Sequence, residues 1–207
     1  LVQLANDDCD VAPTPMRTDS AGRFTVQTFL TGEPDGVTLG NAHVDFLAKL
    51  MHPGRRIQLD AVAEMLRARR NELSESGVLH GETLAQVDAI LDRHRWIGNV
   101  PGVRSHGDFA PWNLKMCRDG HIRAVDWEDS AESELPYFDL HHYRRSVNNS
   151  LGRKCAAPWE AYTAALKRVD PELSTDTAQT ACAAAGLRHL FRHESEIERN
   201  SRQYDGG

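Results

Sequence analysis

Residues 105–130, SHGDFAPWNLKMCRDGHIRAVDWEDS, contain the strongest local structural signal in the chain. Two short apolar segments, 114–117 and 121–125, have the character of β-strands, and Asp119-Gly120 lies between them. Asp-Gly between two such segments is the strongest short-range signal for a β-hairpin. The sequence therefore predicts a hairpin here, with the rest of the chain as its scaffold.

Polar side chains cluster at the open end of this hairpin. If Asp119 and Gly120 are the two loop residues, Asn113 lies directly opposite Asp126, with Cβ atoms about 5 Å apart. Two hard oxygen ligands this close suit Mg²⁺, which usually takes one or two protein groups plus substrate phosphates. Asp108 precedes them in an irregular loop and is well placed to accept a hydroxyl proton during phosphate transfer. The alternative is a plain hairpin with a surface aspartate and a structural asparagine.

The order and spacing of these residues resemble a known catalytic core. His106-x-Asp108-x-x-x-x-Asn113, followed by Asp126 after a hairpin, resembles protein-kinase-like phosphotransferases. HGDFAPWN, VDWED and the later LPYFDL are similar to the aminoglycoside phosphotransferase and choline kinase branch. The resemblance implies that Asp108 is the catalytic base, that Asn113 and Asp126 hold Mg²⁺, and that His106 and Asp139 support the catalytic loop.

The same resemblance implies the fold: α+β, a kinase-like C-terminal lobe, mostly helical, with a catalytic β-hairpin and an N-terminal edge strand. Residues 23–30, RFTVQTFL, are rich in β-branched and aromatic side chains and predict that strand. By resemblance it leads into a hinge, where the backbone of Thr28, Phe29 and Leu30 contacts adenine. Residues 1–31 are then a small-lobe remnant with the hinge, and residues 32–207 the large lobe. An edge strand followed by a turn is the alternative.

Elsewhere the chain reads mainly as helices. Apolar periodicity predicts helices at 37–51, 59–73, 83–96, 136–147, 159–169 and 175–200, while residues 1–20 read as irregular. Val103 and Arg104 form a short strand before the hairpin. His189 and His193 have a spacing that can hold a metal, but a charged helix end is the favoured interpretation because no third ligand is evident.

Composition narrows the function classes. The chain has 207 residues, 40% hydrophobic and 26% charged, and its net charge of −6 gives no reason to expect nucleic acid as a partner. No apolar segment approaches membrane-spanning length, and no signal peptide is evident. The four cysteines are far apart with no Cys-x-x-Cys pair, which favours reduced thiols in a cytoplasmic protein. The oligomeric state does not follow from the sequence.

The predicted function is transfer of the γ-phosphate of a nucleoside triphosphate, ATP or GTP, to a hydroxyl of a small molecule. Members of the family phosphorylate aminoglycosides, choline and sugars. Four acidic residues that follow Asp126 would attract a cationic acceptor, and a solvated acidic surface is the alternative; they are Glu128, Asp129, Glu132 and Glu134.

The small-lobe machinery is not evident in the sequence. No glycine-rich loop precedes Phe24, and Lys49 is the first lysine, whereas a complete kinase-like enzyme needs a phosphate loop and a strand lysine. The resemblance therefore runs from about Phe24 to Tyr143. Either upstream residues are missing from this chain, or the native protein has lost them and is a truncated, catalytically weak kinase-like binding module. A metal-dependent hydrolase using His106, Asp108 and Asp126 as ligands is a third alternative.

Overall fold

Helices form most of the computed structural model, which describes residues 11–13, 15–18, 25–27, 32–36 and 38–204. Within these residues the α-helices are α2 (Asn41–Ala48), α3 (Leu59–Glu75), α4 (Gly81–Arg93), α5 (Phe138–Ser150), α6 (Trp159–Val169) and α7 (Thr175–Tyr204). Short antiparallel sheets accompany them. The expected α+β architecture, mostly helical with a small hairpin, is confirmed.

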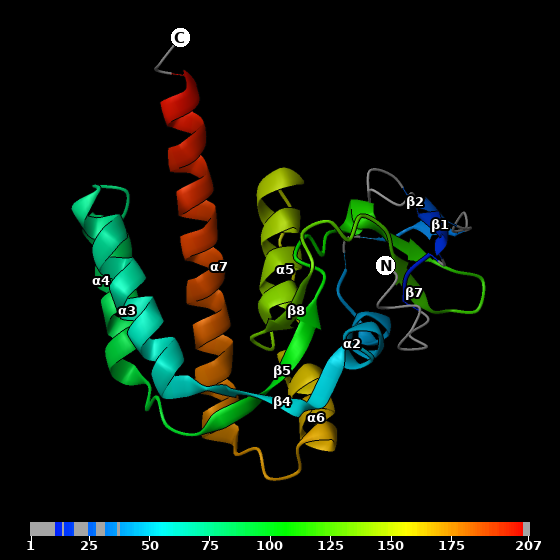
Figure 1. Cartoon of the computed structure of the whole chain (residues 1–207), viewed down its shortest axis with the longest axis horizontal. Coiled ribbons are helices and arrows are strands. Elements are labelled where there is room, and N and C mark those ends of the chain that lie inside the picture. Colours follow the sequence, from blue (N-terminus) through cyan, green and yellow to red (C-terminus); the bar gives the residue numbers. More distant parts are fainter. Residues whose placement is uncertain (1–10, 14, 19–24, 28–31, 37, 205–207) are drawn as a thin grey trace.

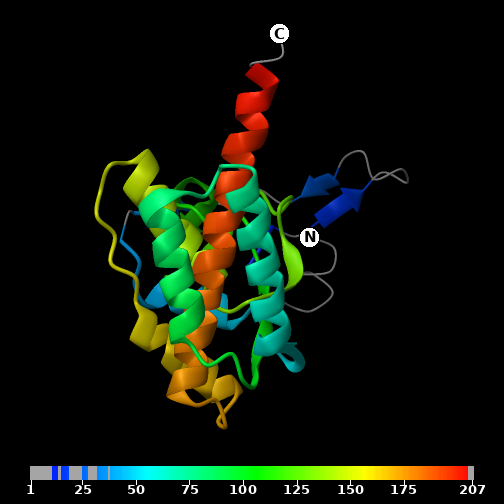
Figure 2. The same ribbon diagram turned by 90° about the vertical axis from the view of Figure 1, so that its left-hand side faces the viewer.

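The long helix α7 runs through the helical part of the molecule (Figure 1). α3 and α4 form a pair on one side of it, with α3 packed on α7, and α5 packs against α7 from the other side. Figure 2 shows α3 and α4 in front of α7, whose C-terminal end extends past both of them. The helices α3 and α5 therefore flank α7 on two sides.

The helix boundaries follow the apolar stripes closely. α6 spans the predicted residues and α7 begins at the predicted Thr175. In α3, Leu59, Val62 and Leu66 are buried at helical spacing, as expected for a core-facing stripe. Among the residues described, no helix combines the length and the apolar character needed to cross a membrane.

A three-stranded antiparallel sheet was largely missed by the sequence patterns. Its order is β4 (Met51–Gln58), β5 (Asn99–Ser105) and β8 (Ala131–Glu134). Only Val103 and Arg104 had been expected as a strand, and Met51 had been placed in a helix. β4 has no clear alternation of apolar and polar residues, and its pairing with β5 is irregular between Met51 and Arg56. Pairing with a distant segment, rather than local propensity, makes it a strand.

The hairpin is present, but its register differs by one residue from the prediction. β6 (Leu114–Met116) pairs with β7 (Ile122–Ala124), with Met116 opposite Ile122 and Leu114 opposite Ala124. β3 (Glu33–Pro34) pairs with the other side of β6. As a result, the backbone N–H of Val125 donates to the carbonyl of Asn113 (2.9 Å), so Val125 rather than Asp126 faces Asn113.

The loop conformation explains this correction. A two-residue type I′ turn needs positive φ at both central residues. Gly120 has φ +80°, whereas Asp119 is not among the residues with positive φ. The backbone N–H of Cys117 donates to the carbonyl of His121 (2.9 Å), and the N–H of Gly120 donates to the carbonyl of Cys117 (3.0 Å). The loop therefore contains Arg118 as well as Asp119 and Gly120, which shifts every pair by one residue.

The N-terminal region contains a further strand pair. β1 (Pro15–Thr18) pairs antiparallel with β2 (Thr25–Gln27). The strand expected at 23–30 is confirmed for β2, and the irregular structure expected for residues 1–20 is wrong for β1. The predicted adenine-contacting residues Thr28, Phe29 and Leu30 lie outside the described residues, and the division of the chain at residue 31 stays a prediction.

Candidate active site

The loop between β5 and β6 carries the predicted catalytic residues, and Gly107 shapes it. Gly107 has φ +85°, a conformation that side chains other than glycine adopt at a cost. A Cβ atom at this position would lie only 2.7 Å from the carbonyl carbon of Asp129 and closer still to its oxygen. The loop therefore needs glycine here both for its backbone conformation and for its close contact with the Asp129 backbone.

Asp139, in the first turn of α5, anchors this loop. One carboxylate oxygen accepts the backbone N–H of His106 (2.8 Å) and the other accepts that of Gly107 (3.1 Å). The side chain is buried, and burial raises the pKa of Asp139. The first turn of a helix favours a carboxylate. The structure thus brings Asp139 to the loop that carries Asp108.

His106 is completely buried beneath the loop. Its Nε2 donates to the backbone carbonyl of Val125 (2.8 Å), and its ring lies 4.6 Å from the ring of Trp127, centre to centre. It is not among the residues that line the cavity beside Asp108. These contacts tie the loop to the hairpin segment that carries Val125 and Trp127.

Asp108 is held through both of its carboxylate oxygens. Oδ1 accepts a hydrogen bond from Nε2 of His142 (2.7 Å), and Oδ2 accepts one from Nδ2 of Asn113 (2.8 Å). The hydrogen bond from His142 is the main cause of a lowered pKa for Asp108, which outweighs partial burial. Asp108 is therefore a fixed, deprotonated acceptor with about a third of its side chain exposed.

His142 is itself oriented by His189. Nε2 of His189, on α7, lies 3.1 Å from Nδ1 of His142, on α5. Burial is the main cause that lowers the pKa of His189 to about 3, so its ring is neutral near neutral pH. With His189 donating through Nε2, His142 keeps its own proton on Nε2 for Asp108. No local sequence pattern predicts this chain of contacts, because the two histidines meet only when α5 packs on α7.

A polar cavity of about 320 Å³ opens beside Asp108, between α5 and α7. It is lined by Asp108, Asp129, His142, Arg145, Ser146, Asn149, Ser150, His189, Arg192, His193 and Glu196. Most of these side chains carry hydrogen-bonding groups. The cavity is suited to a small molecule with several polar groups, such as a polyhydroxylated compound.

The two predicted metal ligands, Asn113 and Asp126, differ in exposure: Asn113 is buried and Asp126 is exposed. Asn113 uses only Nδ2 in its hydrogen bonds to Asp108, which leaves its carbonyl Oδ1 for a cation. Asp126 is exposed, and its φ of +62° turns the chain out of the strand next to Asn113. Among the described residues no group of three or more His, Cys, Asp or Glu side chains could hold a metal ion. Oxygen donors of this kind are the ligands that Mg²⁺ takes together with substrate phosphates.

The acidic residues that favoured a cationic acceptor are mostly paired with arginines. Glu132 pairs with Arg55 (3.4 Å), Glu134 with Arg188 (2.7 Å) and Asp129 with Arg192 (3.2 Å). Their charges are largely balanced within the protein. They therefore give little reason to prefer a cationic acceptor.

Acidification is expected to destabilise the fold through two imidazoles, those of the buried His189 and the partly buried His141. Burial lowers their pKa values from 6.5 to about 4 and about 3. Below pH 6.5 the unfolded chain binds protons that the folded chain does not, so the free energy of unfolding falls as the pH falls towards 4. Each imidazole accounts for roughly 2 kcal/mol at pH 5. Urea denaturation at pH 7 and pH 5 measures the loss.

Burial raises the pKa of Asp139, so this carboxyl group stabilises the fold as the pH falls, opposite to the two histidines. A pair of variants separates the contribution of His189 from that of Asp139. His189→Gln should reduce the loss of stability between pH 7 and pH 5, whereas His80→Gln, at an exposed position, should leave it unchanged. Equal pH dependence in His189→Gln and the unmodified protein would contradict the assignment.

Comparisons with known proteins give only distant matches. No protein-family model and no curated protein matches the chain. Among solved structures, a choline/ethanolamine kinase family protein from Mesorhizobium loti is 16% identical, with a TM-score of 0.42, over 97% of this chain and 78% of that chain. Two structures of glucosamine kinase, one in complex with glucosamine, ADP and inorganic phosphate, are each 18% identical, with TM-scores of 0.39, over 95% of this chain. The chain spans 56% and 55% of those two structures.

Proposed function

We propose that this protein belongs to a phosphotransferase lineage and transfers the γ-phosphate of ATP to a hydroxyl group of a small polar molecule. The observation that carries the proposal is the setting of Asp108. Its carboxylate is deprotonated, is fixed by His142 and Asn113, and borders a polar cavity large enough for a small acceptor. A fixed carboxylate of this kind suits a base that accepts the proton of an attacking hydroxyl group.

The remaining residues have supporting roles in this proposal. Asn113 and Asp126 would hold Mg²⁺, which supplies charge neutralisation on the transferred phosphate. His106 and Asp139 hold the loop that carries Asp108. The backbone at residues 28–30 is proposed to contact the adenine. Positioning and electrostatic stabilisation provide most of the acceleration in this chemistry, so the rigidity of this loop matters as much as the base.

An acceptor screen tests the proposal. The protein is incubated with ATP and Mg²⁺, and ADP formation is measured with panels of sugars, amino alcohols and aminoglycosides. We expect ADP formation that requires one class of hydroxyl acceptor and gives a phosphorylated product in equal amount, detectable by ³¹P NMR.

Two other results would identify the alternatives. Release of inorganic phosphate without any acceptor, lost in His106→Ala and retained with Zn²⁺ or Mn²⁺, would indicate a metal-dependent hydrolase. Binding of Mg²⁺ and ATP with no turnover for any acceptor would indicate a kinase-like binding module.

A further inference from the structure

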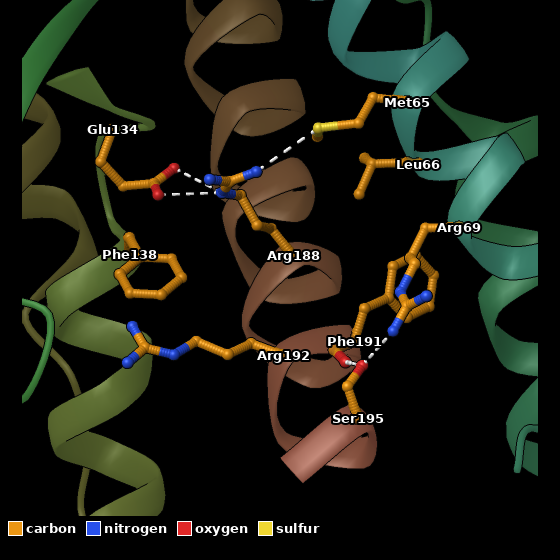
Figure 3. A pocket seen from close by; sticks show the side chains of 9 residues that line it. All are labelled: Met65, Leu66, Arg69, Glu134, Phe138, Arg188, Phe191, Arg192 and Ser195. Carbon is orange, nitrogen blue, oxygen red and sulfur yellow. Dashed lines mark hydrogen bonds and ion pairs between the residues drawn. The ribbon is translucent and has the colours of Figure 1, made fainter. Parts of the chain in front are cut away.

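A second cavity, of about 320 Å³, lies between α3, α5 and α7, and the lining residues labelled in Figure 3 do not include Asp108. Its volume is at the lower end of the range for small-molecule sites. Three side chains that line it, Leu66, Phe138 and Phe191, are almost fully buried and provide an apolar wall. Met65, on α3, also lines this cavity and is 40% exposed. The lining of the cavity therefore includes an apolar, partly aromatic surface.

Three arginine side chains line the same cavity as this apolar wall. Arg69 reaches in from α3, and Arg188 and Arg192 from α7, as Figure 3 shows. Each of these side chains is about 40% exposed, so the guanidinium groups meet solvent at the opening. Glu134 is the one carboxylate among the described residues of the lining, and Arg188 pairs with it (2.7 Å). The lining thus has more positive than negative charge.

The other two arginines have partners that a ligand can replace. Arg69 pairs with Glu72 (2.6 Å) and donates to Ser195 (2.5 Å). Arg192 pairs with Asp129 and Glu196, whose side chains are about half exposed. Exposed ion pairs of this kind contribute little to stability. A carboxylate, in contrast, can take two parallel hydrogen bonds from a guanidinium group.

We propose that this cavity binds a small molecule with an apolar or aromatic body and one anionic group such as a carboxylate. The body packs against Leu66, Phe138 and Phe191, and the anionic group meets Arg69. Arg192 also lines the cavity beside Asp108, so the two sites are neighbours. This binding site is separate from the proposed phosphate transfer. Because the binding test contains no nucleotide, the proposal of an anion-binding cavity and the proposal of phosphate transfer can fail independently.

Three probes of matched shape and different charge test the site. Isothermal titration of the 207-residue chain with 3-phenylpropanoate, 3-phenylpropan-1-ol and 3-phenylpropylamine should give binding of the carboxylate at least about tenfold tighter than of the alcohol or the amine. Comparable affinities for all three probes, or no binding of the carboxylate, would overturn the proposal.

Two arginine variants on the same helix locate the binding. Arg69→Gln should weaken binding of 3-phenylpropanoate by about tenfold. Arg67→Gln, on the exposed side of α3 and outside the lining, should leave the affinity unchanged. Both replace exposed or half-exposed side chains, and circular dichroism checks that both remain folded. Equal affinities of the Arg69→Gln variant and the unmodified chain would exclude this cavity as the site.

Discussion

Replacing Asp108 by asparagine is expected to lower the rate of phosphate transfer by about 10²–10⁴-fold, the usual contribution of a general base. The amide is nearly the same size as the carboxylate, but it cannot accept the proton of the hydroxyl group. Because Asp108 does not belong to the proposed metal pair, the affinity for ATP with Mg²⁺ should change by less than about threefold. Steady-state rates with saturating acceptor, together with ATP titration, separate the two effects.

Asp45→Asn, at an exposed position on α2, is the matched control and should keep the full rate. A further variant, His142→Gln, distinguishes the base from its support. It removes the hydrogen bond to Oδ1 of Asp108 and should lower the rate less than Asp108→Asn does, with a changed pH profile. An Asp108→Asn variant with the full rate of transfer would remove Asp108 from the mechanism.

Replacing Gly107 by alanine is expected to destabilise the fold by roughly 3 kcal/mol, a sum of backbone strain and steric overlap. The left-handed backbone conformation alone disfavours alanine, and the added Cβ would in addition overlap the backbone of Asp129. The loop must shift to accept it, which also weakens the hydrogen bonds from His106 and Gly107 to Asp139. Urea denaturation measures the free energy of unfolding.

Gly120 provides a control with the same backbone conformation and no overlap. Its φ is +80°, and a Cβ there would meet nothing within 4 Å. Gly120→Ala should therefore cost about 1 kcal/mol, from the backbone conformation alone. If the two alanine variants lose the same stability, the close contact between Gly107 and Asp129 does not constrain the loop.

The parts of the structure set by local sequence were predictable. The apolar stripes of α3, α6 and α7 gave helices at the expected places, and Asp-Gly gave a hairpin. The motif also identified side chains that meet in space. Asp108 contacts Asn113, and Asp139 accepts a hydrogen bond from the backbone of His106, in the loop that carries Asp108. Asp108 and Asn113 are close in the sequence, and Asp139 belongs to the same family-like pattern, so sequence alone could associate these residues.

The parts that depend on long-range packing were not predictable. Strand β4 is defined by its pairing with β5, and its own residues show no strand pattern. His142 and His189 reach Asp108 only because α5 packs on α7. The hairpin register depends on the backbone conformation of a single residue, Asp119. The Asp-Gly sequence alone does not determine that conformation.

Titration of the 207-residue chain with ATP, with and without Mg²⁺, tests the central claim most directly. Asp126→Asn removes the proposed metal carboxylate, and Glu128→Gln neutralises an exposed carboxylate two residues away as the control. The proposed site predicts ATP binding that requires Mg²⁺, is weakened at least about tenfold in Asp126→Asn and is unchanged in Glu128→Gln. Absence of ATP binding, or an affinity that neither Mg²⁺ nor the Asp126→Asn substitution changes, would contradict it.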